Sequence, residues 1–214
     1  PAGLARWAPE SGGNGHYYQG VPVVGGINWT GARDAALARG GYLATLTSQA
    51  ESDFVYANVA SAPALWPTRI GPWIGLRQNF ASPAYAEPAG GFEWVTGEAG
   101  SFVNWAAGEP NNDPGFGPGY NERVVCYYNY NCGGQPQNQW NDVPDFYGVT
   151  DCGGTVYVGA YIVEFDTIYS LVLDLYSEVG DDWAPTNLTA EDDWEDVFVD
   201  TAEGPHERLR ERLD

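Results

Sequence analysis

The stretch from Gly97 to Asn141 constrains the fold most, because it is rich in Gly, Pro and Asn, which favour loops over regular helix or sheet. Val124–Tyr128 interrupts it as a short apolar run that predicts a central strand. Oxygen-bearing side chains are concentrated in this stretch and at its end. They are Glu109, Asn111, Glu122, Asn141 and Asp142. Calcium takes about 6–8 oxygen ligands and accepts donors from separated loops, so we predict a calcium site made of these residues.

The composition predicts a folded chain, either one domain with an appendage or two small domains. With 214 residues, 43% of them hydrophobic, and nine Trp, the chain can form a sizeable core. The net charge of −20 argues against nucleic acid and anionic membranes as partners, because phosphates would repel it. No run of about eighteen apolar residues is present, so we expect no membrane span.

Local patterns predict two helices among short strands. An Ala-rich run from Ala32 to Ala38 ends at Gly40-Gly41 and predicts the first helix. Ser48 can cap a second helix, with Glu51 three residues later as in a capping box. Apolar and alternating runs predict the strands. These runs are His16–Val24, Tyr42–Leu46, Trp73–Leu76, Phe92–Val95, Val124–Tyr128 and Val156–Phe165.

The composition divides the chain into three parts. These are an irregular N-terminal lead-in (1–15), a main domain (16–166) and an acidic C-terminal extension (167–214). The extension holds fourteen acidic and three basic residues. Its apolar segment Ile168–Val179 suits a strand added to another sheet, and a solvated linker is the alternative. The mixed charges of Glu207–Arg212 predict a short helical end.

Histidine and cysteine give no sign of an enzyme. His16 and His206 are far apart, and no catalytic Ser or Cys constellation lies near either in the sequence. The three cysteines Cys126, Cys132 and Cys152 allow one disulfide and one remaining thiol, and their pairing stays open. We therefore expect a binding protein rather than an enzyme.

Residues 16–166 carry a series of short motifs in a definite order. They are Trp29-x-x-Ala32, Gly40–Leu46, Trp73-Ile74-Gly75-Leu76, Phe92-Glu93-Trp94-Val95, Asn104–Asn112, Trp140-Asn141-Asp142 and Tyr161–Glu164. Together they resemble the C-type lectin-like domain. The resemblance implies an α+β fold in which two helices flank small antiparallel sheets and a long loop binds calcium. Here a C-terminal extension follows that fold.

The resemblance also implies a function. In that family a Glu-Pro-Asn triplet, a downstream Glu and an Asn-Asp pair bind one calcium ion, and two vicinal sugar hydroxyls complete its coordination. The matching residues, implied as both calcium ligands and sugar-binding residues, are Glu109, Asn111, Glu122, Asn141 and Asp142. Pro110 is expected in a cis peptide. The family likeness thus implies a secreted or cell-surface module that binds mannose-type carbohydrate through calcium.

A second interpretation uses the same fold differently. The chain would be a structural or protein-binding module, such as a scaffold or filament subunit, and calcium would be structural only. In both interpretations residues 167–214 are candidates for self-assembly or for contact with a protein partner. Carbohydrate remains the expected partner in the first interpretation alone.

The chain departs from the family at its disulfides. The four corresponding positions are Ala36, Val124, Asp145 and Val163, so neither usual bridge can form and we expect packing to replace them. Cys132 and Cys152 could cross-link the binding loop, while Cys126 suits a buried strand position.

Aromatic residues near the loop fall into two groups. Trp105 and Trp140 are expected to pack inside the domain. The others are expected to form an exposed rim that contacts ligand. They are Phe116, Tyr120, Tyr127, Tyr128, Tyr130 and Tyr147.

Overall fold

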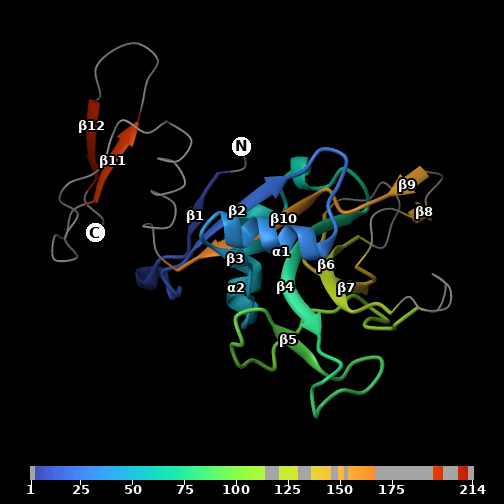
Figure 1. Cartoon of the computed structure of the whole chain (residues 1–214). Coiled ribbons are helices and arrows are strands. Elements are labelled where there is room, and N and C mark those ends of the chain that lie inside the picture. The colour runs from blue at the N-terminus through green and yellow to red at the C-terminus, as the bar shows by residue number, and fades with distance from the viewer. Residues whose placement is uncertain are drawn as a thin grey trace. The chain divides into compact units, whose positions relative to one another are not determined.

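The computed structural model describes residues 3–113, 121–129, 136–145, 149–151, 154–166, 195–199 and 207–211 (Figure 1). The chain contacts divide it into two units, Pro1–Ser170 and Leu171–Asp214. The first unit has an α+β fold with two α-helices and one mixed sheet, as the sequence predicts.

Both predicted helices are present, and each begins at a side-chain cap. In α1 (Trp29–Ala38) the Asn28 side chain accepts a hydrogen bond from Gly31 N at 3.0 Å. In α2 (Gln49–Val55) Ser48 Oγ accepts one from Glu51 N at 3.2 Å, and a π-helical turn at Tyr56–Ala60 continues the helix. Within the described residues, no helix combines the length and apolar character needed to cross a bilayer.

The first unit contains an eight-stranded sheet (Figure 1). Its main path in spatial order is β1 (Ala5–Arg6), β2 (Tyr17–Pro22), β10 (Ala160–Phe165), β4 (Ile70–Gln78), β6 (Val124–Tyr128) and β7 (Trp140–Val143). In addition, β3 (Tyr42–Leu43) pairs with β10 and β5 (Phe92–Trp94) pairs with β4. The pairing of β10 with β4, at Tyr161 and Trp73, is parallel, and the other pairings in this sheet are antiparallel. The predicted central strand is β6, which lies between β4 and β7.

Part of the N-terminal lead-in belongs to the sheet. Ala5 pairs with Tyr18, and Arg6 pairs with Tyr17. The expectation of an irregular lead-in is therefore wrong for these two residues. The Gly and Pro content of the lead-in favours irregular structure, and this strand is only two residues long, so no sequence pattern indicated it. A separate hairpin is formed by β8 (Val149–Asp151) and β9 (Gly154–Val156).

The second unit contains an antiparallel hairpin of β11 (Glu195–Val199) and β12 (Glu207–Glu211). The helical end predicted for Glu207–Arg212 is therefore wrong, because residues 207–211 form a strand. The arginines Arg208, Arg210 and Arg212 recur every second residue, which suits a strand better than a helix. The segment Ile168–Val179 lies outside the described residues.

Two tryptophans join α1 to the middle of the sheet. Trp29 Nε1 donates to Ile74 O, and Trp73 Nε1 donates to Ile27 O, both at 2.8 Å. Leu46 and Ile74 are fully buried nearby in the main core. Removing the side chain of a buried Ile or Leu commonly costs about 2–5 kcal/mol, so this core stabilises the framework on which the loops are built.

Packing occupies the positions where the family has disulfides. Ala36, Val124 and Val163 are all buried. The fourth position, Asp145, accepts hydrogen bonds from the backbone N–H and the hydroxyl of Thr30. At this position a polar contact between α1 and the segment after β7 therefore replaces the cysteine.

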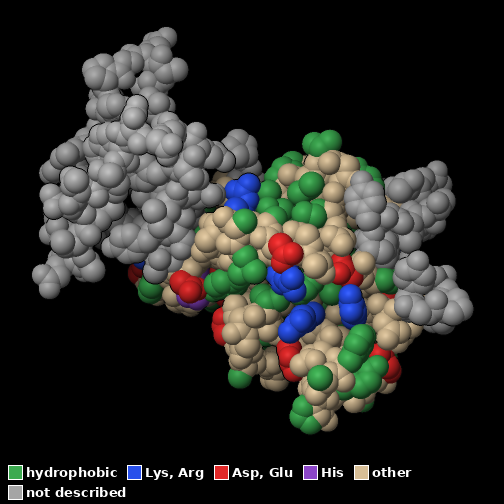
Figure 2. Space-filling model, viewed as in Figure 1, with side chains coloured by type: hydrophobic (Ala, Val, Ile, Leu, Met, Phe, Trp, Pro, Cys, Tyr) green, Lys and Arg blue, Asp and Glu red, His purple; other side chains and the backbone are tan. Residues whose placement is uncertain are grey.

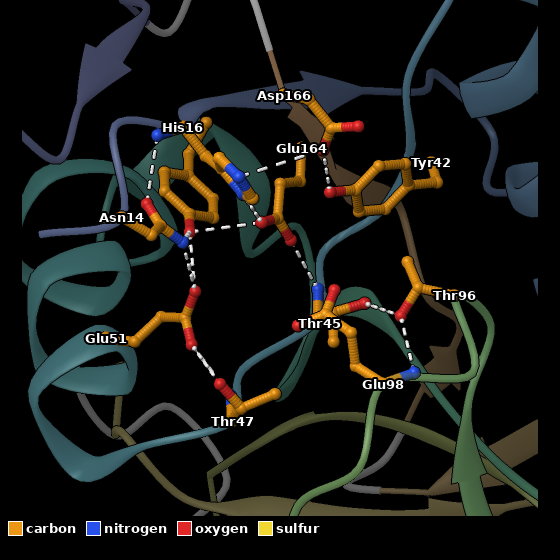
Figure 3. Close-up of polar contacts among 11 residues, drawn as sticks. Asn14, His16, Tyr42, Thr45, Thr47, Glu51, Thr96, Glu98, Glu164 and Asp166 are labelled. Carbon is orange, nitrogen blue, oxygen red and sulfur yellow. Dashed lines mark hydrogen bonds and ion pairs between the residues drawn. The ribbon is translucent and has the colours of Figure 1, made fainter.

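A buried carboxylate network joins the N-terminal segment to α2 and β10 (Figure 3). It contains the carboxylates of Glu51 and Glu164, which are 3% and 1% exposed. Glu51 Oε1 accepts from Tyr18 Oη at 2.6 Å and from Asn14 Nδ2 at 2.8 Å. Glu51 Oε2 accepts from the backbone N–H of Thr47 at 2.7 Å and from its hydroxyl at 3.0 Å. Both oxygens of this buried carboxylate are therefore satisfied.

Glu164 is also satisfied on both oxygens. Its Oε1 lies 2.6 Å from His16 Nδ1 and accepts from Tyr18 Oη at 3.2 Å, and its Oε2 accepts from Thr45 N at 2.7 Å. Burial raises the pKa of Glu164 to about 6, while the hydrogen bonds from His16 and Thr45 lower it. The hydrogen bond with Glu164 raises the pKa of His16. The network is thus a set of acceptors matched by donors from the chain itself.

Candidate calcium site

The edge of the sheet at β7 positions the predicted site. Trp140 N donates to Asn104 O, and Ala106 N donates to Trp140 O, both at 2.8 Å. These bonds fix the segment that leads to Glu109, whose own N–H donates to Ala106 O at 3.0 Å. The peptide between Glu109 and Pro110 is cis, as expected. Residues 104–106 therefore lie beside Trp140 of β7, and Glu109 is bonded back to Ala106.

The carboxylate of Asp142, a residue of β7, accepts hydrogen bonds from the backbone at the tip of this loop. Its Oδ1 accepts from Asn111 N and its Oδ2 from Asn112 N, both at 3.1 Å. On the other side, Glu122 Oε2 accepts from Asp113 N at 2.5 Å, and Glu122 N donates to Asn112 Oδ1 at 3.1 Å. The segment 111–113 is thus held between Asp142 and Glu122.

Three carboxylates interact electrostatically at this place, which we call the loop site (Glu109, Glu122 and Asp142). Burial, followed by the charge of Asp142, raises the pKa of Glu109 to about 7, and the Glu109 carboxyl is within hydrogen-bonding reach of Asp142. Burial, and to a smaller extent the charges of Asp142 and Glu109, raises the pKa of Glu122 to about 8. Burial also raises the pKa of Asp142. Burial, together with the neighbouring carboxylates, therefore disfavours the charged forms of these carboxyls.

Within the part of the chain that the structure describes, two acceptors at or beside the loop site are buried without a hydrogen-bond partner. They are Glu109 Oε2 and Asn141 Oδ1. Asn141 is 9% exposed and lies on β7 opposite Cys126 of β6. An unpartnered buried acceptor costs about 1–3 kcal/mol, and more when it is charged, so both oxygens are open to a hydrogen-bond donor or a cation. The available donors are all oxygens, which is the set that a hard cation such as calcium prefers.

The five predicted site residues differ in how the structure uses them. Asp142 raises the pKa of Glu109 and Glu122, Glu109 raises that of Glu122, and Asn141 adds a buried amide oxygen. Asn111 contributes its backbone N–H to Asp142, and the residue as a whole is exposed. Among the described residues, no group of three His, Cys, Asp or Glu side chains already has the arrangement of a metal cage. Asp142 and Glu122 instead accept hydrogen bonds from loop amides.

Sequence reasoning missed Asn112 and Asp113. Asn112 has a φ of 46° and contacts both Asp142 and Glu122, while Asp113 donates its N–H to Glu122. The run Asn111-Asn112-Asp113 was the available signal, because Asn and Asp tolerate the left-handed backbone that tight loops require.

The expected aromatic rim is wrong for two residues. Tyr127 and Tyr128 are 0% and 7% exposed, because β6 is an interior strand. Phe116, Tyr120, Tyr130 and Tyr147 lie outside the described residues. The packing expected of the two tryptophans is found, since Trp140 is fully buried and Trp105 is half-buried against it, with ring centroids 6.3 Å apart.

Cys126 is buried on β6, as expected, and its thiol is free. Burial, and then the charges of Glu122, Asp142 and Glu109, raises the pKa of this thiol well above its usual value. It is therefore poorly suited to act as a thiolate. Cys132 and Cys152 lie outside the described residues, so their proposed cross-link stays a prediction.

No protein-family model matches the chain, and a search of curated proteins found no relative. Among solved structures, the chain is similar to the cow C-type carbohydrate-recognition domain of CD23, determined in the presence of a GlcNAc2Man3 oligosaccharide. That similarity has 23% identity and a TM-score of 0.45, over 70% of this chain and 87% of the other.

Two further solved structures are similar at the same level. For herring type II antifreeze protein the identity is 20% and the TM-score 0.46, over 70% of this chain and 90% of the other. For the Ca2+-independent C-type lectin SPL-2 of Saxidomus purpuratus the identity is 22% and the TM-score 0.49, over 78% of this chain and 93% of the other. The likeness is one of fold.

Proposed function

We propose that the chain is a carbohydrate-binding module that recognises sugar through calcium held at the loop site. The ligands would be Glu109, Asn111, Glu122, Asn141 and Asp142. The observation that carries this proposal is the pair of unpartnered buried acceptors, Glu109 Oε2 and Asn141 Oδ1, beside carboxylates that raise one another's pKa. A cation is the simplest partner for such a group, because it offsets charge and satisfies oxygen acceptors together.

The chemistry of the donors favours calcium over a transition metal. Zinc sites are built from imidazole and thiolate ligands with about four donors, whereas these five side chains offer carboxylate and amide oxygens alone. The Cys126 thiol is held in its neutral form, which also disfavours a soft metal. Extracellular calcium modules commonly bind the ion with a Kd of about 10⁻⁴–10⁻³ M. A secreted or cell-surface location would suit a partly exposed site of this kind.

When bound, calcium would supply coordination positions for two sugar hydroxyls. The chain's own contribution is to orient those hydroxyls, because carboxylates accept hydrogen bonds and amide NH2 groups donate them. The order acid then amide in Glu109-Pro110-Asn111 supports a mannose-type preference, by resemblance to lectins that carry this triplet. The exposed position of Asn111 leaves its amide available to a ligand in solvent.

One observation also favours the structural alternative. Asp142 already uses both carboxylate oxygens to hold the backbone of Asn111 and Asn112. If these bonds persist with calcium present, the ion would stiffen the loop without offering positions to a sugar. The module would then bind a protein partner or assemble, and calcium would raise its stability alone.

The test measures calcium and sugar separately. Calorimetric titration with calcium chloride alone should show one site in the wild type and none in Glu122→Gln. Retention on immobilised mannose should require calcium, disappear with chelator and disappear in Asn111→Ala. Asn58→Ala is the matched control, because Asn58 is an exposed Asn that bonds Phe54 O within its own helical segment. Calcium uptake without retention on any sugar matrix would reject carbohydrate binding and favour the alternative.

The mannose preference has its own test. Exchanging acid and amide, in the double variant Glu109→Gln with Asn111→Asp, reverses donors and acceptors while keeping the size of both side chains. We expect retention to move from mannose toward galactose matrices. If the variant binds calcium and still prefers mannose, the order of this triplet does not set the preference.

A further inference from the structure

The loop between β4 and β5, residues 79–91, is a packed structure with its own hydrogen bonds. Its base is closed by Asn79 N donating to Gly91 O at 2.7 Å. Inside it, Gln78 Nε2 donates to Gly90 O at 3.0 Å and to Glu87 Oε2 at 3.3 Å. Gln78 is itself 5% exposed, so the loop is built on a buried amide. Compact surface loops of this length often carry function.

Two aromatic rings are displayed on this loop. Phe80 and Tyr85 are 44% and 36% exposed, and they are the aromatic members of the exposed large hydrophobic residues in the described part of the chain. Their rings meet edge to face with centroids 5.3 Å apart. Tyr85 Oη donates to Glu87 Oε1 at 2.6 Å, which fixes its ring. Figure 2 shows hydrophobic side chains gathered at the lower end of this face, where Figure 1 places the loop.

Backbone contacts bring this loop next to the loop site. Gln78, the last residue of β4, donates its N–H to Arg123 O at 2.7 Å, and Arg123 follows Glu122 directly. Glu87 is close enough to Asp142 for its charge to act on that carboxyl, although burial is the larger influence there. The aromatic pair and the loop site are therefore carried by adjoining strand ends.

We propose that Phe80 and Tyr85 form an accessory surface for the second sugar unit of a glycan whose terminal unit occupies the loop site. This rests on the proposed function. An aromatic ring packs well against the apolar C–H face of a pyranose, and a neighbouring hydroxyl and carboxylate suit the sugar's polar edge. Tyr85 Oη and Glu87 supply that polar edge beside the ring.

The size of the surface argues for a sugar over a protein partner. Stable protein interfaces bury about 1,200–2,000 Å² in total and need many residues on each side. Two partly exposed rings offer far less area, but enough to cover one sugar ring. The surface would thus discriminate oligosaccharides from monosaccharides while leaving the calcium ligands unchanged.

The test compares ligands that do and do not reach the loop. Affinities for methyl mannoside and for mannose disaccharides and trisaccharides are measured by calorimetry in calcium, for the wild type and for Phe80→Ala, Tyr85→Ala and the double variant. The double variant should lose about tenfold in oligosaccharide affinity and less than about twofold for the monosaccharide. Leu37→Ala, which trims an exposed apolar residue of α1, is the control and should change neither.

Tyr85→Phe separates the effect of losing the ring from the effect of misfolding the loop. It keeps the ring and removes the hydroxyl, so oligosaccharide affinity should stay within about threefold of the wild type. An oligosaccharide affinity that is unchanged in the double variant, or a loss equal for both ligand sizes, would overturn the accessory surface while leaving the loop site standing. A wild type that takes up calcium but binds neither ligand would reject the proposed function and the accessory surface with it.

Discussion

Two groups of carboxylates in the same domain differ in how completely the chain satisfies the acceptors around them. In the buried carboxylate network, Glu51 and Glu164 each receive hydrogen bonds on both oxygens from named donors of the chain. At the loop site, Glu109 Oε2 and Asn141 Oδ1 are buried and receive none. The first group is complete as the chain folds. The second has acceptors left over, for which we propose a cation.

This difference indicates how a buried acid with a structural role can be told from one that binds a ligand. Burial alone does not separate them, because Glu51, Glu164, Glu122 and Asp142 are all nearly inaccessible. The balance of donors and acceptors does. Where donors match acceptors, the carboxylates join elements of the fold, and where acceptors exceed donors we propose that a cation binds.

The largest expected effect comes from breaking the complete group. Glu51→Ala removes the acceptor of Thr47 N and one of the two acceptors of Tyr18 Oη and of Asn14 Nδ2. We expect the free energy of unfolding to fall by about 3 kcal/mol, measured by urea denaturation in chelator. Glu10→Ala removes an exposed Glu and should change it by less than about 0.5 kcal/mol. A loss below about 1 kcal/mol for Glu51→Ala would show that the network contributes little.

The next effect is the response to calcium. At a calcium concentration about one hundred times Kd, binding to the folded chain should add about 2.7 kcal/mol to the free energy of unfolding. Glu122→Gln should abolish this increment. Glu164→Gln should keep it, because the network is satisfied without the ion and distant sites act additively. Denaturation curves that coincide with and without calcium would contradict the assignment of the loop site.

A smaller effect concerns the loop site without calcium. Glu109 and Glu122 have pKa values raised from 4.5 to about 7 and about 8. A raised pKa means that the folded state holds protons which the unfolded state releases, so the stability they contribute is present below pH 4.5 and is lost as pH rises through 7 and 8. Calcium-free protein should therefore lose stability over this range.

Glu109→Gln isolates one of these groups. Without calcium it should match the wild type near pH 5 and be more stable near pH 8.5 by about 1 kcal/mol, after allowance for solvent screening. The measurement is the difference between the two unfolding curves at each pH, in which the titration of His16 and Glu164 largely cancels. A variant that is less stable at pH 8.5 would mean that the Glu109 charge is already balanced.

The secondary structure was predictable because its signals are local. Asn28 and Ser48 cap helices where their side chains occur in the sequence, and the apolar run Trp73–Leu76 lies inside β4. The burial of Tyr127 and Tyr128 had a signal too. Val124–Tyr128 is continuously apolar instead of alternating, which is typical of a strand covered on both faces.

The candidate site was predictable in its residues and not in its bonding. The motif spacing pointed to Glu109 and Asp142, but the hydrogen bonds of Asp142 with the loop amides depend on how residues about thirty apart in sequence meet. The same holds for Glu51. Its capping position was visible in the sequence, whereas its bonds with Asn14 and Tyr18 arise from tertiary packing.

The smallest effect tests whether the network itself depends on pH. His16 donates to Glu164 and is faced by the carboxylates of Asp166 and Glu98, and the bond with Glu164 raises its pKa above 6.5. Because the shift is upward, the stability from protonated His16 is full below pH 6.5 and is lost as pH rises through the raised value. His16→Asn should therefore cost about 1 kcal/mol at pH 5.5, and about half as much at pH 8.5, where a neutral side chain donates in both proteins. The measurement is the difference in free energy of unfolding between the two proteins at each pH, with chelator present so that the loop site does not contribute through calcium. An equal cost at both pH values would mean that His16 acts as a neutral donor throughout.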